Sequence, residues 1–200
     1  MEPPAEASAE DSAAVEVSAE AEGASEAVAP QAAGEMQLRR ALRHLLTTHW
    51  SSRRHFPQPV LEEITRAIRE AESTHTAQLR FVVESALDLP HLWRSTTPRR
   101  RALRLFGELG IWDTAANNGV LIYLLLADRV VEIIADRGIA ARVSQSEWES
   151  VCRQMERHFT TARFRDGSIA GIQAVAALLA KHFPGSLGGV NELPDKPVIL

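Results

Sequence analysis

The chain has 200 residues and a formal net charge of −4, but its first 34 residues differ sharply from the rest. They hold eight of the 26 acidic residues and none of the 22 basic ones, so the remainder carries about +4. This composition excludes a folded core there, and we assign residues 1–35 to a disordered acidic tail rich in Ala and Glu. The single cysteine, Cys152, excludes an internal disulfide and a cysteine-based zinc cluster.

Two interpretations of the acidic tail stay open. It can act only as a solubilising segment, or it can fold back on basic surface and compete with another anion. The N-terminus shows no pattern of a secretory signal, and the longest apolar run, residues 120–127, is far shorter than the roughly 20 residues that span a bilayer. We therefore expect a cytoplasmic protein, with peripheral attachment at a membrane as an open alternative.

A basic amphipathic helix is predicted for residues 36–55. Apolar side chains recur at three- and four-residue spacings, with basic ones on the other face. The helix can bind a protein or a membrane-associated partner, or it can pack its apolar face on its own domain and leave its charged face in water. The residues assigned to the partner-binding helix are Arg39, Arg40, Arg43, Leu42, Leu46 and Trp50.

An α/β domain is predicted for residues 56–184. It starts with a helix from about Pro59 to His75, followed by a buried strand, Leu79 to Ala86, rich in β-branched and aromatic residues. A helix from about Pro98 to Leu109 comes next. Thr97 is a candidate cap for it, and Gly110 is placed to end it.

The second half of the domain contains a predicted β-hairpin. Val120–Leu126 is continuously apolar, and only Ala127, Asp128 and Arg129 separate it from Val130–Ala135, a spacing that requires antiparallel pairing. A mixed sheet covered by helices follows from this order.

Two helices complete the domain. Ser144 with Glu147 three residues later predicts a capping box, and a last helix begins near Asp166. We assign residues 185–200 to an extended C-terminal tail.

Two segments, NNGVLIYLLLADRVVEIIADRGI (117–139) and FRDGSIAGIQAV (164–175), resemble the signature of the TPM-domain family. The resemblance implies a three-layer α/β/α sandwich with a small mixed sheet containing a β-hairpin, here with an additional N-terminal helix. It also implies divalent-metal binding with a weak phosphatase-like activity, or protein-partner roles in membrane complexes. Ala140 stands where the family usually has Glu, and Arg53, Arg54 and His55 stand where many members have acids.

Each end of the hairpin gathers polar residues that we treat as a candidate site. At one end Asp113, Asn117, Asn118 and Asp136 offer the oxygen ligands that Ca²⁺ or Mg²⁺ takes, although such residues are also plain turn formers. At the other end a helix start and neighbouring arginines can bind an anion such as phosphate, or can simply form a cap with solvated arginines. The residues assigned to this anion site are Thr97, Arg99, Arg100, Asp128 and Arg129.

No catalytic residue is identified by the sequence. Cys152 lies on the apolar stripe of its predicted helix, which favours a core role over a nucleophile. The seven histidines form no zinc-binding pair, and no nucleic-acid-reading motif accompanies the arginines. We therefore expect a non-enzymatic interaction module for a protein or membrane-associated partner, with a divalent-metal-dependent phosphatase-like hydrolase as the alternative.

Overall fold

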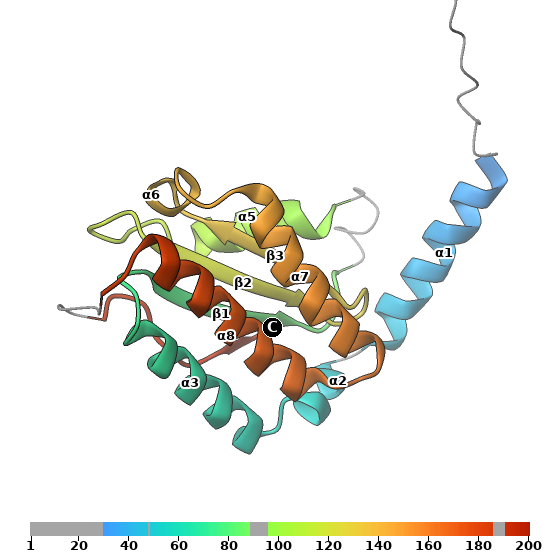
Figure 1. Cartoon of the computed structure of the whole chain (residues 1–200). Helices are drawn as coiled ribbons and strands as arrows, with labels where there is room; N and C mark the ends of the chain where they lie inside the picture. Colours follow the sequence, from blue (N-terminus) through green and yellow to red (C-terminus); the bar gives the residue numbers. More distant parts are fainter. Residues whose placement is uncertain (1–29, 48, 89–95, 186–190) are drawn as a thin grey trace, which may run out of the picture.

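The computed structural model describes residues 30–47, 49–88, 96–185 and 191–200 (Figure 1). The expected disordered tail falls almost wholly on residues 1–29, which lie outside this part. The described helices are α1 (Pro30–Leu46), α2 (His49–His55), α3 (Gln58–Glu72), α5 (Pro98–Glu108), α6 (Arg137–Ala140), α7 (Gln145–Thr160) and α8 (Phe164–His182). The strands are β1 (Gln78–Glu84), β2 (Gly119–Leu125), β3 (Val130–Ala135) and β4 (Val198–Ile199).

The centre of the domain is an open mixed sheet with the order β3-β2-β1-β4. β1 pairs parallel with both β2 and β4, and β2 pairs antiparallel with β3. The hairpin register sets Val120 opposite Ala135 and Leu125 opposite Val130, which confirms the predicted antiparallel pairing. Every residue of β2 is buried, as its unbroken apolar run requires of a strand covered on both faces.

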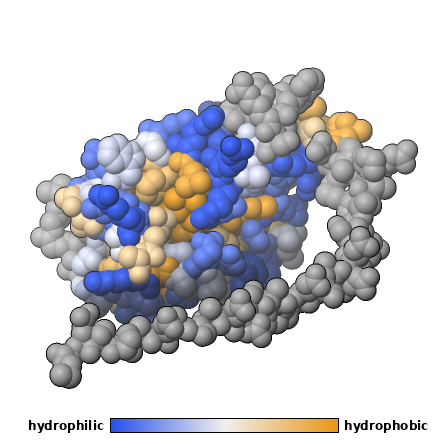
Figure 2. All heavy atoms as spheres, turned by 90° about the horizontal axis from the view of Figure 1, so that it is seen from above, coloured by the Kyte–Doolittle hydropathy of each residue, from blue (hydrophilic) through white to orange (hydrophobic). Residues whose placement is uncertain are grey.

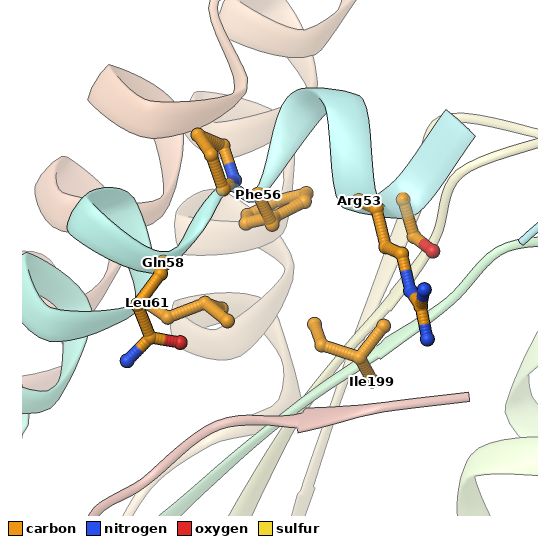
Figure 3. A pocket seen from close by; sticks show the side chains of 7 residues that line it. Arg53, Phe56, Gln58, Leu61 and Ile199 are labelled. Carbon is orange, nitrogen blue, oxygen red and sulfur yellow. The ribbon is translucent and has the colours of Figure 1, made fainter. Parts of the chain in front are cut away.

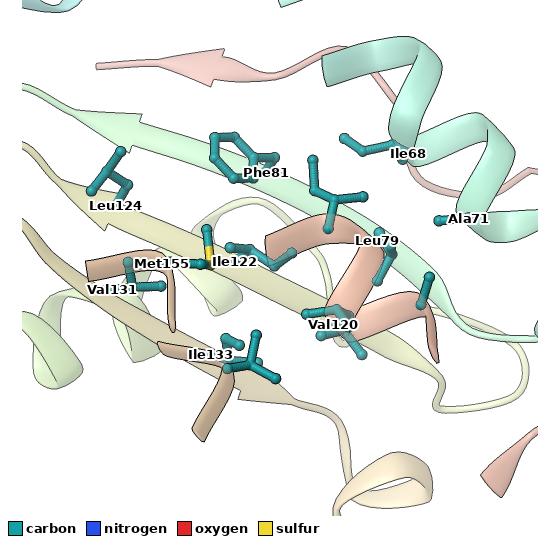
Figure 4. Close-up of a cluster of buried hydrophobic side chains, with 14 of the residues drawn as sticks. Ile68, Ala71, Leu79, Phe81, Val120, Ile122, Leu124, Val131, Ile133 and Met155 are labelled. Carbon is teal, nitrogen blue, oxygen red and sulfur yellow. The ribbon is translucent and has the colours of Figure 1, made fainter. Parts of the chain in front are cut away.

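Helices α3, α7 and α8 cover one face of this sheet and form the front layer in Figure 1. Their apolar stripes meet the alternate residues of the strands that point to this side, and the side chains in Figure 4 interdigitate there. The contributions include Ile64 and Ile68 from α3, Met155 from α7 and Ile122 from β2, each 0% exposed.

Helix α5 alone among the described helices covers the opposite face. Ala102 and Leu105 pack on Leu121, Tyr123 and the other strand residues of that side. Thr97 caps α5 as predicted, because its side chain accepts a hydrogen bond from the backbone N–H of Arg100. The predicted α/β/α sandwich is therefore confirmed.

Local sequence signals predicted most helix ends to within two residues of their positions in the structure. The capping box of α7 is present, with Ser144 accepting from the Glu147 backbone and Glu147 accepting in return. Helix α8 begins at Phe164, two residues before the expected Asp166. No helix among the described residues is both long and apolar enough to cross a membrane.

The two ends of the described chain depart most from expectation. The basic segment forms two helices, α1 and α2, and α1 begins at Pro30, inside the range assigned to the tail. Residues 198–199 form strand β4 beside β1, where the sequence predicted only an extended tail. α1 projects away from the domain on one side (Figure 1).

Candidate functional site

Helix α1 is held on the domain by the carboxylate of Asp128. Asp128 lies in the turn between β2 and β3, and its Oδ2 accepts from Arg40 Nε at 2.9 Å. His44 Nε2 lies 3.2 Å from Asp128 Oδ1, and Arg43 approaches the same oxygen at 3.5 Å. Three cationic or titratable side chains of one helix therefore converge on a single acid.

His44 is fixed in orientation by a second contact. The backbone N–H of Leu87 donates to His44 Nδ1 at 2.9 Å, so in the neutral ring the proton is on Nε2, which faces Asp128. The ring is 4% exposed. Burial alone would raise the pKa of Asp128, but hydrogen bonds from His44 and Arg40 hold it below its ordinary value. Asp128 thus stays ionised and keeps α1 in place.

The polar side of α1 faces the domain, so its leucines face solvent. This is the reverse of the expected packing alternative, in which the apolar face is buried and the charged face is wet. Leu38, Leu42, Leu45 and Leu46 are 49–79% exposed, and we call these four residues the leucine row. Seen from above, apolar side chains project at the side of the molecule where α1 lies (Figure 2). Trp50 belongs to α2, but its side chain lies outside the described part.

The candidate metal residues gather only in part. Asn117, with a positive φ of 50°, accepts from the Arg137 guanidinium through its side-chain oxygen and from the Gly138 N–H through its backbone oxygen. Asp136 caps α6 by accepting from the Arg137 N–H. Gly138 permits this close approach, since a Cβ there would lie 2.5 Å from the Asn117 carbonyl oxygen.

Two oxygens at this end of the hairpin have no hydrogen-bond donor among the described residues, namely Asn118 Oδ1 and Asp136 Oδ2, both buried. The Asn118 amide donates to Thr76 O, whereas Asp136 is directed to α6 and Asp113 is exposed. The described residues contain no group of three His, Cys, Asp or Glu side chains that could hold a metal. These residues do not form a complete set of ligands for Ca²⁺ or Mg²⁺, which takes six or more oxygens.

The candidate anion residues have internal partners at the other end of the hairpin. Arg99 contacts Glu132 at 3.4 Å, and Arg129 donates to Thr160 O at 2.8 Å from a residue with φ of 56°. Thr97 is used as the cap of α5, and Asp128 is used by α1. Arg100 is exposed on α5. Four of the five side chains are therefore engaged by other groups of the protein.

A buried network of polar side chains lies at this same end of the hairpin. Glu84 ends β1 and accepts from Arg101 through both oxygens, at 2.9 to 3.1 Å, and from the Tyr123 hydroxyl at 2.5 Å. Burial and the Glu84 charge raise the pKa of Tyr123 well above its usual range. Glu84 lies near the end of the first predicted strand and Arg101 in the first turn of the next predicted helix, so local signals locate each residue but not their contact. The one signal for Tyr123 was a lone hydroxyl within an apolar strand. The Arg101 guanidinium is thereby committed to an internal carboxylate.

A second polar cluster had no signal in the sequence. Glu72, 6% exposed, accepts from the Leu79 N–H at 2.7 Å and lies beside Asp195 of the C-terminal segment. Burial and the Asp195 charge raise the pKa of Glu72 to about 7. Asp195 also accepts from Arg69 at 2.9 Å, which ties the C-terminal segment to α3. This pairing spans more than 120 residues and cannot be inferred from local spacing.

Cys152 has the environment of a core thiol. It packs against the buried cluster under α7, and burial raises its pKa to about 12. A thiol with so high a pKa is almost entirely protonated at neutral pH and is a poor nucleophile.

Comparison with solved structures identifies proteins of the same fold. The NMR structure of the BA42 protein from the psychrophilic bacterium Bizionia argentinensis is 28% identical, with a TM-score of 0.62 over 71% of this chain and 93% of that one. The N-terminal domain of a protein from P. gingivalis, solved by NMR, is 21% identical and shows the fold alone, with a TM-score of 0.52 over 63% of this chain and 79% of that one. No curated protein matches the sequence.

The sequence model of the TPM domain matches residues 56–178, which run from two residues before α3 into α8. This range contains the hairpin, three of the four strands and both clusters around Glu84 and Asn117, while α1 and β4 lie outside it. The match covers more than half of the chain, so this protein belongs to the TPM-domain family.

Proposed function

We propose that this protein is a non-enzymatic interaction module in which α1 presents the leucine row to a protein or a membrane-associated partner. The observation that supports it is the direction in which α1 is held. Its polar side is anchored on Asp128 while four leucines stay in solvent. An exposed row of large apolar side chains is unfavourable in water and is typical of a surface that another molecule covers.

The exposed charged side chains described on α1 and α2 are all basic. They are Arg39 and Arg43 on α1, the helix of the leucine row, and Arg53 and Arg54 on α2. An amphipathic helix of this kind binds either an apolar groove of a protein or the boundary of an anionic membrane.

The test removes the apolar row without disturbing the anchor. In Leu42→Ser/Leu46→Ser, both changed side chains are exposed, so the fold is expected to persist. Binding to vesicles with 30% phosphatidylglycerol is measured by sedimentation, and protein partners are captured by a photo-crosslinker at position 45. Leu103→Ser is the matched control, because Leu103 is 51% exposed, close to the 49% of Leu42, but lies on α5.

We expect the double variant to lose at least tenfold in whichever of the two assays the wild type is positive, with the control unchanged. Equal binding or crosslinking by the wild type and the double variant contradicts the proposal. So does equal loss in the Leu103→Ser control, which would indicate unspecific adhesion.

The alternative, a divalent-metal-dependent phosphatase-like hydrolase, has one observation in its favour, the two buried oxygens of Asn118 and Asp136 that lack donors. The Arg137 guanidinium on Asn117 opposes it, because a cation there must compete with a fixed positive charge. A bound metal would raise the melting temperature in Ca²⁺ or Mg²⁺ for the wild type but not for Asp136→Ala. Equal melting temperatures with and without metal would remove this alternative.

A further inference from the structure

A continuous groove runs between α3 and the C-terminal segment. It has two compartments of about 440 and 610 Å³, which share Gln58 and Leu61. The larger one is lined by a single stripe of α3 from Gln58 to Arg69, facing Lys196. The smaller one reaches past the start of α3 to Arg53 of α2 and to Ile199 of β4 (Figure 3).

The strand that borders this groove is an edge of the sheet. β4 pairs with β1 on one side only. Leu200 uses both of its backbone groups toward β1, donating to Val83 O at 2.9 Å and accepting from Ser85 N at 3.1 Å. Backbone groups alternate in direction along a strand, so the N–H and C=O of Ile199 point away from β1. A free donor and acceptor are thus available for a further strand.

The charges around the groove are unbalanced. Its acid Glu62 accepts from Gln58 at 3.0 Å, and the neighbouring Asp195 is paired with Arg69. Within the described residues, Arg53, Arg66 and Lys196 form no ion pair, and all three are exposed. The rim therefore carries positive charge that an acidic ligand can neutralise.

The floor of the smaller compartment is apolar. Phe56 is 2% exposed, and Leu61 and Ile199 are half-buried. In Figure 3 the side chains of Leu61 and Ile199 extend into the same space below Phe56. This space can receive one aliphatic side chain of a ligand.

We propose that this groove binds an extended acidic segment of a partner protein, which adds to the sheet as a strand beside β4 and inserts an aliphatic side chain above Ile199. The proposal deepens the proposed function as an interaction module and rests on it for the existence of a protein partner. Strand addition uses main-chain hydrogen bonds for affinity and side-chain pockets for specificity. An acyl chain would fill the floor but would leave the backbone groups of Ile199 without partners, so a peptide fits better than a lipid.

The probe is a seven-residue peptide of alternating glutamate and valine, acetylated and amidated, with a fluorescein label. Its binding to the full chain is followed by fluorescence anisotropy at 50 mM salt. A matched peptide, N-methylated at alternate residues on its pairing edge, keeps the charges and side chains but cannot pair as a strand. Arg66→Glu/Lys196→Glu reverses two exposed charges of the rim, and Arg100→Glu on α5 is the control on the other face of the sheet.

We expect the wild type and Arg100→Glu to bind alike, with at least tenfold weaker binding for the rim variant and for the N-methylated peptide. No binding at 1 mM peptide, or unchanged binding in the rim variant, overturns the proposal. Equal binding of the N-methylated peptide, or tight binding of laurate in place of the peptide, overturns strand addition. The Leu42→Ser/Leu46→Ser variant separates this proposal from the proposed function of α1, because it removes two leucines of the leucine row and leaves the groove unchanged.

Discussion

Single polar residues in this protein take their properties from burial. Glu84 and Glu72 both lie at strand or helix ends and are less than a tenth exposed, yet their partners differ. The negative charge of Glu84 is compensated by the Arg101 guanidinium and by a hydrogen bond from the Tyr123 hydroxyl. Burial and the like charge of Asp195 disfavour the carboxylate form of Glu72, and its one backbone N–H donor offsets this only in part.

Glu72 should make the stability of the fold depend on pH. Its pKa of about 7 in the folded protein exceeds the usual 4.5, so the folded state holds the proton more tightly than the unfolded state. Stability is lost as pH rises from about 4.5 through 7. We expect Glu72→Gln to gain on the order of 2 kcal/mol over the wild type between pH 5 and pH 8 in urea unfolding.

The comparison between Glu72→Gln and the wild type also removes the contribution of His75. Burial lowers the pKa of His75 to about 4, so this residue destabilises the fold only as pH falls below about 6.5. An equal difference between variant and wild type at pH 5 and pH 8 would show that Glu72 is ionised throughout.

The helix pair α7 and α8 depends on a close approach at the start of α8. The turn between the helices contains Ala162 at a positive φ of 57°. A Cβ on Gly167 would lie 2.5 Å from the Phe159 ring and 2.7 Å from His158 Cβ. Both groups are held by α7, so the two helices can pack here only because residue 167 lacks a side chain.

Gly167→Ala should therefore destabilise the protein by about 1–3 kcal/mol, because the overpacking outweighs the higher helix propensity of alanine. Thermal or urea unfolding measures it. Gly107→Ala is the matched control on α5, where a Cβ meets nothing within 4 Å, and it should be neutral or stabilising by up to about 1 kcal/mol. Equal effects of the two substitutions would contradict the packing argument.

At the scale of the whole molecule, a packed sandwich carries a helix, α1, whose described side chains make few contacts with it. In the described part of α1, residues 38–46, the contacts run through Asp128 and the His44–Leu87 hydrogen bond, and little apolar surface is buried. An element of this kind can be released at low cost in free energy. The open edge of β4 and the projecting α1 are the two surfaces that we propose for partners.

Asp128→Ala should release α1 from the sandwich while the sheet stays intact. Amide exchange at Leu87, whose N–H is bonded to His44, should rise at least tenfold, and exchange in β2 should not change. Arg43→Ala is the control. Arg43 is 59% exposed and its distance to the same acid is as long as 3.5 Å, so this ion pair contributes little. Unchanged exchange at Leu87 in Asp128→Ala would show that α1 is held by other contacts.

The sequence by itself determined the features that depend on neighbouring residues. The apolar run of β2, the polar pair Asp128-Arg129 and the run of β3 predicted the hairpin, and the spacing of Ser144 and Glu147 predicted a helix start. The match of residues 117–139 and 164–175 to the TPM signature predicted the sandwich. Each of these signals is local, because a cap, a turn or an alternation is formed within a few residues.

Tertiary structure alone decided which distant residues meet. The two-residue strand β4 is too short to show a period, and it exists because β1 offers it hydrogen bonds. The amphipathic pattern of α1 showed two faces, but only the position of Asp128 decided that the polar face is held and the leucine row is exposed. The pairs Glu72 with Asp195 and Tyr123 with Glu84 form for the same reason, since contacts between segments far apart in the chain depend on how the layers pack.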